Sequence, residues 1–540
     1  MPKKIFYDQE ARERILGGAK TLYDAVKVTF GPKGRNVIIN KSYGNPTITH
    51  DGVTVAEAIE LAEQDDKQLG YNIGVKLIKT AAQKLNKVAG DGTTTVTVLT
   101  YNLIAEANKL IAAGHNPMEL RKDIEKAGAE ILKKIGEQTE KIDGNSTKIA
   151  EIATISAGDA TIGKLIADTI AKIGKDSVVT VEAGQGLEME SEITEGFTYD
   201  KGFSSPFFVT DTNRQEAVMA KAPILITDKK ISSVNDLVPF LEKLAASGQK
   251  DLVIIAEEVE GEALSVLVLN KLKGVFNTLV LKAPAFGDRR KEIMEDIATL
   301  TGATLVSSDK ALSLDHVGLE VLGHADKVIA SKDESTIIGA KGNKKALQER
   351  IQLIKTQAEL ASSDYEREQL ENRAAALEGK VAVIKVGGAT ETEIDEKKYR
   401  VDDAVAATKA ALDEGIVLGG GVTLLNLAAG LKGDHPGEII VKNALKAPFL
   451  QIMENAGLNA AALLDQVEHA KPGQGINVLK PEAGLIDLKK DGVIDPARVT
   501  REAIQNAISI AATTITMGSL IVDLPEPEKD AAGSAMPGMY

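Results

Sequence analysis

The segment Ala89-Gly-Asp-Gly-Thr-Thr-Thr95, followed by a helical pattern over residues 96–113, has the composition of a phosphate-binding loop. Glycines let the backbone approach a ligand closely, and free N–H groups at a helix start attract phosphate. The threonine hydroxyls add hydrogen-bond donors, and Asp91 could hold Mg²⁺ as a hard oxygen ligand. The alternative is an ordinary turn in which a threonine caps the helix. The pattern therefore predicts either a phosphate site or a capped turn.

Two further glycine clusters could lie against a nucleotide. Thr29-Phe-Gly-Pro-Lys-Gly-Arg35 lies between a helical pattern and a strand pattern, and Gly419-Gly-Gly421 follows a predicted helix over 404–414. Taken alone, the first also fits a Gly/Pro turn and the second also fits tight helix packing. The sequence contains neither a Walker A motif nor a strand followed by G-x-G-x-x-G. A standard P-loop and a Rossmann site are therefore unsupported.

Two aspartates near these clusters could serve hydrolysis. Asp51 lies in Thr49-His-Asp-Gly52, and Asp403 lies at a predicted helix start. A carboxylate near a γ-phosphate can orient or deprotonate water and can bind a metal ion. For Asp402 and Asp403 the alternative is favourable charge at a helix N-terminus. The six histidines include no pair four residues apart, which argues against a zinc site.

The elements that must position these residues are mostly helical at both ends of the chain. Helical periodicity covers residues 9–28 and 68–136 and returns from 401 to 522. The longest charge-free stretch, Ala503–Val522, is long enough to span a bilayer, but its polar residues predict a helix buried in protein. The N-terminus has no secretory or transit signal, so the sequence predicts a cytoplasmic protein.

The middle of the chain has a different pattern. Short β-branched runs alternate with helical stretches over residues 177–330, which is typical of an α/β unit. Charged, Ala-rich periodicity over 344–378 predicts a helical hairpin broken near Ser362-Ser363, and a strand follows at 381–386. The sequence thus predicts a helical domain formed by both chain ends, with an α/β unit inserted between them.

Two helical stretches of the α/β unit are more apolar than one buried face requires. A helix that covers a sheet needs a single apolar stripe, but residues 234–246 and 261–272 carry apolar side chains on more than one face. Phe203, Phe207 and Phe208 lie in a short segment upstream. Such an excess indicates either deeper burial or an exposed binding patch.

Composition limits the class of protein. The chain has 540 residues, 64 Lys and Arg against 78 Asp and Glu, a net charge of −14, and no cysteine. Apolar residues make up 43%, which excludes global disorder, and the length suggests about three or four domains. The lack of cysteine excludes disulfides, zinc ribbons, iron–sulfur clusters and thiol nucleophiles. The negative charge argues against a general nucleic-acid binder.

Five separated motifs occur together and carry a family resemblance. They are Thr29-Phe-Gly-Pro-Lys-Gly-Arg-Asn36, Thr47-Ile-Thr-His-Asp-Gly52, Ala89-Gly-Asp-Gly-Thr-Thr-Thr95, Ala285-Phe-Gly-Asp-Arg-Arg290 and Gly419-Gly-Gly-Val422. In this combination the chain resembles the group I chaperonins, the GroEL family, from about Ile5 to Pro525. The resemblance implies an ATPase that binds non-native polypeptides, encloses them under a co-chaperonin lid and times the cycle by hydrolysis.

The resemblance also implies a multidomain α and α/β fold and an assembly. The expected parts are a mostly helical equatorial domain (1–138 and 414–526), a small α/β intermediate domain (139–194 and 382–413), an α/β apical domain (195–381) and a disordered tail (527–540). The expected oligomer has two stacked rings of seven subunits. Its partners would be unfolded polypeptide clients and the co-chaperonin lid, with no nucleic acid and no membrane.

Residue by residue, the resemblance implies ATP and Mg²⁺ as ligands, with K⁺ as an optional cation. Asp403 would activate water with Asp51 beside it, and Asp91 would bind Mg²⁺. The other nucleotide contacts would be Thr29, Phe30, Gly31, Pro32, His50, Gly92, Thr93, Thr94, Thr95, Gly420, Asn477, Val478, Leu479 and Asp495. The client-binding residues would be Phe203, Phe207, Phe208, Val238, Leu241, Leu264, Val268 and Leu269. The hinge candidates are Gly196, Gly379 and Gly415.

The sequence departs from the family pattern in a few places. His50 stands where a Lys is usual, Val478-Leu479 replaces a common Ala-Ala pair, and the segment between Leu61 and Ala89 is longer than usual. Two alternatives follow: a metabolic ATP-dependent enzyme such as a small-molecule kinase, and a chaperonin-like scaffold without turnover. A kinase would bury the apolar stripes and present a polar substrate pocket.

Overall fold

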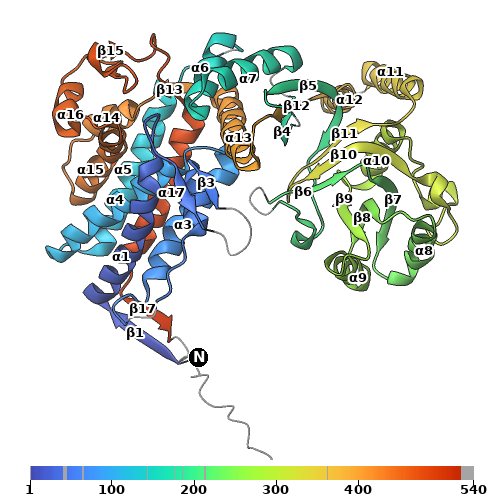
Figure 1. The fold of residues 1–540 in the computed structure, drawn as a ribbon, viewed down its shortest axis with the longest axis horizontal. Helices are drawn as coiled ribbons and strands as arrows, with labels where there is room; N and C mark the ends of the chain where they lie inside the picture. The colour runs from blue at the N-terminus through green and yellow to red at the C-terminus, as the bar shows by residue number, and fades with distance from the viewer. Residues whose placement is uncertain are drawn as a thin grey trace, which may run out of the picture. The chain divides into compact units, whose positions relative to one another are not determined.

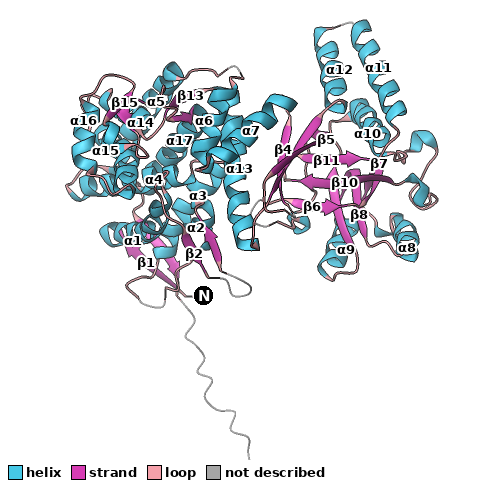
Figure 2. Cartoon of the chain, turned by 45° about the horizontal axis from the view of Figure 1, so that its top comes forward, coloured by secondary structure: helices cyan, strands magenta, loops and turns pink. Residues whose placement is uncertain are grey.

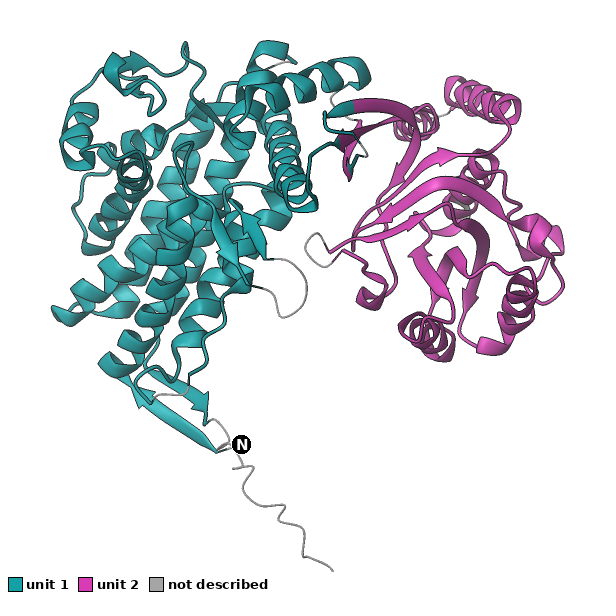
Figure 3. Ribbon diagram, in the orientation of Figure 1, with its two compact units in different colours: residues 1–175, 183–190, 386–540 teal, residues 176–182, 191–385 magenta. Residues whose placement is uncertain are grey.

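The chain forms two compact units, each built from separated segments (Figures 1 and 3). The computed structural model describes residues 2–524 apart from 41–45, 64–65, 143, 175–176, 185, 212–214 and 362. Unit 1 comprises residues 1–175, 183–190 and 386–540, and unit 2 comprises residues 176–182 and 191–385. The prediction that both chain ends form one domain around an inserted unit is confirmed. The finer division into three domains stays a prediction, and the tail lies outside the described residues.

Unit 1 is mostly helical (Figure 2). Its α-helices are α1 (Asp8–Val26), α2 (Gly52–Ala58), α3 (Tyr71–Ala89), α4 (Thr93–Ala112), α5 (Pro117–Gln138), α6 (Ser146–Ala157), α7 (Ala160–Ile173), α13 (Glu391–Glu414), α14 (Val422–Ala429), α15 (Pro436–Asn455), α16 (Ala460–Glu468) and α17 (Ala497–Thr514). Apolar residues spaced three and four apart give α3, α4, α5, α15 and α17 one shared core. This core joins the N-terminal helices to the C-terminal ones.

Short antiparallel ribbons accompany these helices. The pairs are β1 (Lys3–Tyr7) with β17 (Ser519–Asp523), β2 (Val37–Ile39) with β3 (Thr47–Thr49), β13 (Ile416–Leu418) with β16 (Ile494–Pro496), and β14 (Gln474–Ile476) with β15 (Leu485–Asp487). The prediction of one helix over Ala503–Val522 is wrong after Thr514. The helix ends there, and Ser519–Asp523 form a strand because β1 supplies backbone partners for it. Within the described residues, no helix combines the length and the apolar character of a membrane span.

Unit 2 is built on a mixed sheet that has nine strands among the described residues (Figure 2). The strand order is β4-β12-β5-β11-β10-β7-β8-β9, and β6 pairs with β10. The strands are β4 (Val178–Ala183), β5 (Glu190–Tyr199), β6 (Ala217–Ala220), β7 (Pro223–Ile231), β8 (Asp251–Val259), β9 (Asn277–Lys282), β10 (Gly323–Ala330), β11 (Ser335–Ala340) and β12 (Lys380–Val386). Strands β7, β8 and β9 are parallel. The predicted α/β unit is therefore confirmed.

The helices of unit 2 connect and cover this sheet. They are α8 (Val238–Ala246), α9 (Gly261–Leu272), α10 (Gly287–Thr301), α11 (Lys344–Leu360) and α12 (Asp364–Leu377). The last two form the predicted hairpin. Asp296 of α10 is fully buried, and its carboxylate accepts hydrogen bonds from Arg350 Nε at 2.7 Å and from Arg373. These ion pairs satisfy a charge that would otherwise be costly to bury and attach the hairpin to α10.

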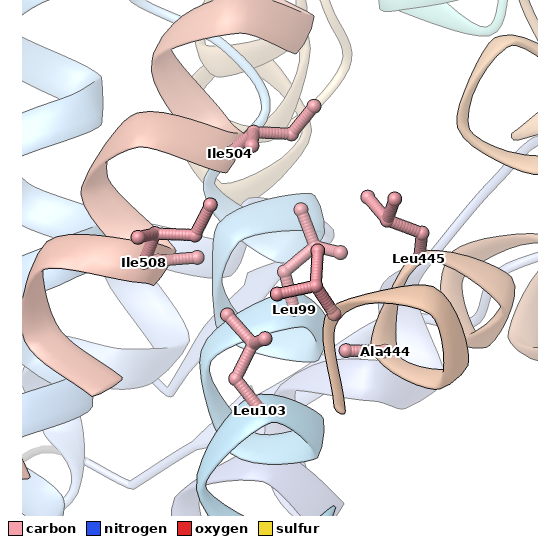
Figure 4. Close-up of a pocket in the computed structure, with 8 residues that line it drawn as sticks. Leu99, Leu103, Ala444, Leu445, Ile504 and Ile508 are labelled. Carbon is pink, nitrogen blue, oxygen red and sulfur yellow. The ribbon is translucent and has the colours of Figure 1, made fainter. Parts of the chain in front are cut away.

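The core of unit 1 contains a small packing gap (Figure 4). A cavity of about 10 Å³ lies between α4, α15 and α17, and the close-up shows Leu99, Leu445 and Ile504 pointing into it. Its lining is apolar, and its volume is that of about one water molecule. It is a defect of packing and is too small for a nucleotide.

Candidate functional site

Three loops singled out by the sequence lie against one another in unit 1. We call residues 29–34 the first loop, 50–52 the second loop and 91–95 the third loop. The Oγ1 atoms of Thr29 and Thr94 are 3.3 Å apart and join the first loop to the third. A Cβ atom on Gly52 would lie 2.5 Å from Oγ1 of Thr94, so the second loop packs directly on the third. The three loops therefore form one site.

The third loop depends on glycine at two positions. Gly92 is the N-cap of α4 with φ of 83°, and a Cβ atom there would overlap Val499. Gly90, just before the loop, has φ of 69°, and its Cβ would lie 2.2 Å from Cβ of Ala406 on α13. Helix α4 then begins at Thr93, so its first N–H groups point into the site as phosphate binding requires. The alternative of a threonine cap is wrong, because a glycine occupies the cap.

Asp91 is a partly buried carboxylate at the centre of the site. Its Oδ2 accepts a hydrogen bond from Ser156 Oγ of α6 at 2.8 Å, and the Gly92 N–H donates to Oδ1. Burial raises the pKa of Asp91, these hydrogen bonds lower it, and the charge of Asp51 raises it further. Within the described residues, no basic side chain offsets this charge. A partly buried carboxylate without a basic partner suits a hard divalent cation such as Mg²⁺.

Asp495 is a second partly buried carboxylate, close enough to the first for their charges to interact. It lies in β16 opposite Val417, and its Oδ1 is 3.0 Å from the Cβ position of Gly419. Burial and then the charge of Asp91 raise the pKa of Asp495 to about 7. In the part of the chain that the structure describes, no three His, Cys, Asp or Glu side chains form a complete metal site. A bound cation would therefore need ligands from the nucleotide as well, which is common for Mg²⁺.

Asp51 and Asp403 occupy different kinds of position. Asp51 is the N-cap of α2, and its carboxylate accepts hydrogen bonds from the N–H groups of Val53 and Thr54 at 3.0 and 2.9 Å. Asp403 lies in the middle of α13, so the alternative of a charge at a helix start is wrong. It precedes Ala406 by three residues and shares its face. Since Ala406 packs on Gly90, this face of α13 is turned toward the segment just before the third loop.

His50 lies between the first loop and α13. Its Cε1 is 2.8 Å from the Cβ position of Gly34. Burial is the main reason that its pKa lies below the usual 6.5; Arg400 lowers it further, whereas Glu396 and Asp51 raise it. The imidazole is therefore mostly neutral at neutral pH.

The residues predicted to contact adenine and ribose lie around one apolar cluster. Val478 is buried in it, and the ring of Phe30 packs against it from the first loop. Asn477 accepts a hydrogen bond from the Leu479 N–H at 2.9 Å and donates to Asp491, whereas the side chain of Leu479 is 57% exposed. The structure thus brings the predicted adenine segment to the apolar side of the phosphate loops.

Comparison with known proteins identifies the family. Residues 22–525 match the family model for TCP-1/cpn60 chaperonins. The chain belongs to the TCP-1/cpn60 chaperonin family. The chaperonin gp146 from the bacteriophage EL 2 (Pseudomonas aeruginosa), crystallised in the presence of ATP-BeFx, is similar in structure. Its TM-score is 0.64 at 20% identity, and the match covers 96% of this chain and 99% of that chain.

Both matches show a multidomain α and α/β chaperonin fold, and the family match supports a chaperone role. They argue against the metabolic kinase, because the family match extends far beyond the phosphate loops. Because the identity to the phage protein is only 20%, that similarity is evidence for the fold alone.

In unit 2 of this chaperonin, the predicted client-binding residues divide by exposure. Phe207 is 63% exposed and Leu269 is 50% exposed. Partly buried are Val238, Leu264 and Val268. Buried in the core of the sheet are Phe203, Phe208 and Leu241. These last three do not offer an apolar surface to a client in this conformation; they support the surface from beneath.

The hinge candidates lie where chain segments cross. The Gly196 N–H donates to the Gly379 carbonyl oxygen at 3.2 Å, inside unit 2. Gly415 has φ of 98°, and its Cβ would lie 2.4 Å from the carbonyl oxygen of Glu140. Its neighbour Ile416 pairs with Glu140 through two backbone hydrogen bonds. Only glycine fits at position 415, where these two segments of unit 1 meet.

Sequence reasoning missed residues that hold the site without belonging to a motif. Ser156 on α6 and Asn455 at the end of α15 both bond directly to a predicted nucleotide-binding segment. Neither stands in a distinctive local pattern, so a single sequence carries no signal for them.

Proposed function

We propose that this chain is a group I chaperonin that uses ATP hydrolysis to drive polypeptide folding. The observation that supports this most is the convergence of the three loops on the N-terminus of α4, with the partly buried Asp91 among them. Free N–H groups, hydroxyls and a carboxylate without a basic partner together fit a nucleotide phosphate with its cation.

In the proposed site, the first and third loops bind the phosphates, through Thr29–Pro32 and Gly92–Thr95. His50 would lie near them from the second loop. Asp91 would hold Mg²⁺, which when bound offsets phosphate charge. Gly420, Asn477–Leu479 and Asp495 would lie around the adenine and ribose.

We assign the proton transfer to Asp403. In hydrolysis the bond between the γ-phosphorus and ADP would break, ADP would leave, and water would form the new bond to phosphorus while this carboxylate accepts a proton from that water. Both oxygens of Asp51 already accept hydrogen bonds from the start of α2. Asp51 is therefore better suited to orient water than to take its proton.

We further propose the client cycle. Phe207 and Leu269 give unit 2 an apolar surface, and apolar burial is non-directional, which suits unfolded chains of many sequences. The finer features proposed are a co-chaperonin lid, two seven-subunit rings, K⁺ as an additional cation, a cytoplasmic location, and the three domains with boundaries near residues 138, 194, 381 and 413.

The proposal is tested by imaging the purified protein in negative stain with and without ATP, together with phosphate release. Stacked sevenfold rings that hydrolyse ATP and suppress aggregation of a denatured client are expected. Rings without phosphate release would favour the scaffold alternative, and rings of another symmetry would contradict the group I assignment.

A further inference from the structure

Three hydrogen-bonded side chains lead from the helices of unit 1 to the first loop. Tyr23 Oη of α1 donates to Gln451 Oε1 at 3.2 Å, and Gln451 Nε2 donates to Asn455 Oδ1 at 2.9 Å. Asn455 Nδ2 then donates to two backbone carbonyl oxygens, those of Lys27 at 2.8 Å and Phe30 at 2.9 Å. These carbonyls flank the turn that enters the first loop. We call Tyr23, Gln451 and Asn455 the relay.

Each member of the relay fixes the orientation of the next. An amide side chain has one donor end and one acceptor end. Asn455 can give both of its N–H groups to the loop only when its oxygen faces a donor, which is the amide of Gln451. Gln451 must then turn its own oxygen toward α1, where the hydroxyl of Tyr23 is the donor. The two backbone carbonyl oxygens thus orient Asn455, and Asn455 orients Gln451. The hydroxyl of Tyr23, which can donate or accept, completes the relay as the donor.

Tyr23 is a firm starting point for this relay. Its ring stacks on Tyr101 of α4, with ring centroids 4.3 Å apart and planes 13° apart. Burial raises the pKa of Tyr23 to about 12, so the hydroxyl keeps its proton at physiological pH. Helix α4 begins in the third loop, so the relay connects the helix of the third loop to the backbone of the first.

Helix α15 also holds the first loop by apolar contact. A Cβ atom on Gly31 would lie 3.3 Å from the side chain of Ile452, and the ring of Phe30 packs on the cluster that contains Phe449 and Ile452. One helix thus fixes both the ring and the carbonyl oxygen of Phe30. A change at the end of α15 would be transmitted to the loop.

We propose that Tyr23, Gln451 and Asn455 are positioning residues that set the first loop against the third and thereby set nucleotide affinity. The inference rests on the proposed nucleotide site. The relay acts on the nucleotide only through the carbonyl oxygens of Lys27 and Phe30.

The test measures ADP affinity of the full-length oligomer in the presence of Mg²⁺ by calorimetry. Asn455→Asp places a carboxylate against two carbonyl oxygens and should raise the Kd about tenfold. Tyr23→Phe keeps the ring stack but removes the donor and should raise the Kd about threefold. Tyr101→Phe removes the other hydroxyl of the same stack, which lies outside the relay, and should leave the Kd unchanged.

A double variant separates the relay from general destabilisation. Once Asn455→Ala has removed the last link, adding Tyr23→Phe should weaken ADP binding no further, whereas independent structural effects would add. Two results would overturn the proposal: losses of ADP affinity that add in the double variant, or losses that are equal for Tyr23→Phe and Tyr101→Phe. If Asn455→Asp does not assemble, the two tyrosine variants decide alone. A wild-type protein that binds no ADP would overturn the proposed function itself, which is a different result.

Discussion

The phosphate loops of unit 1 and the apolar surface of unit 2 use their side chains in opposite ways. In unit 1, Asp91 is partly buried and accepts a hydrogen bond from Ser156, and Asp51 accepts hydrogen bonds from the start of α2. In unit 2, Phe207 and Leu269 expose half or more of their side chains to solvent. Recognition of one ligand needs donors and acceptors held in place, whereas capture of many unfolded chains needs non-directional apolar contact.

Both regions carry groups that are locally unfavourable for a folded chain. Partly buried carboxylates such as Asp91 and Asp495 are destabilising unless a cation joins them, and exposed aromatic side chains promote association. Departures of this kind are expected at functional sites. The comparison predicts that unit 1 is sensitive to charge and geometry and unit 2 is sensitive to polarity.

The largest effect is expected at Asp403. Asp403→Asn removes the proposed proton acceptor and should lower steady-state phosphate release by about 10²- to 10⁴-fold while ADP binding persists. Asp402→Asn, the adjacent acid on α13, is the matched control and should retain most of the activity. Unchanged phosphate release in Asp403→Asn would contradict the assignment of Asp403 as the proton acceptor.

The apolar surface should respond to charge in a way that depends on burial. Phe207→Glu and Leu269→Glu place a charge on the exposed surface, so they should lower binding of a denatured client by about tenfold or more and leave phosphate release intact. Phe208→Glu instead buries a charge in the core of the sheet and should destabilise unit 2.

Two measurements distinguish these cases. Suppression of client aggregation reports client binding, and circular dichroism reports unfolding of the variant. Capture that survives both exposed substitutions would place the client surface elsewhere on the chain.

A smaller, pH-dependent effect is expected at His50. The charged groups that act on its imidazole are Glu396 and Arg400 on α13 and the adjacent Asp51. Because its pKa lies below 6.5, the ring gains most of its positive charge only at a pH below 6.5. ADP affinity should therefore rise about threefold to tenfold between about pH 8 and pH 5.5.

Calorimetry across this range compares the wild type with His50→Gln and His50→Lys. His50→Gln should show a smaller change of ADP affinity with pH than the wild type. His50→Lys should bind ADP tightly at both about pH 5.5 and about pH 8. A profile in His50→Gln that matches the wild type would assign the pH dependence to another group.

The smallest effect is expected in the stability of the nucleotide-free protein. The pKa of Asp495 is raised to about 7 in the folded state, so the unfolded chain releases this proton first, and stability falls as the pH rises from about 4 to about 7. Asp495→Asn should therefore melt a few degrees above the wild type at about pH 8, and the difference should shrink toward about pH 4. The exposed Asp487, whose pKa is lowered, should give no such gain on conversion to Asn.

Much of the fold could be predicted from local patterns. The strands over 178–181 and 252–256, the helix after the third loop and the hairpin over 344–378 lie where the sequence places them. Strand β17 could not be predicted, because Ser519–Asp523 becomes a strand only through pairing with Lys3–Tyr7 at the other end of the chain. Neither segment alone contains that information.

The sequence by itself determined the chemistry that the site can offer: glycines, hydroxyls and a carboxylate ahead of a helix, which are properties of a few consecutive residues. Tertiary structure decided which of these groups meet. It buried Phe208 and exposed its neighbour Phe207, and it brought Asn455 to a carbonyl group 428 residues away. Such outcomes depend on packing between distant segments, and packing, unlike composition, is a property of the whole folded chain.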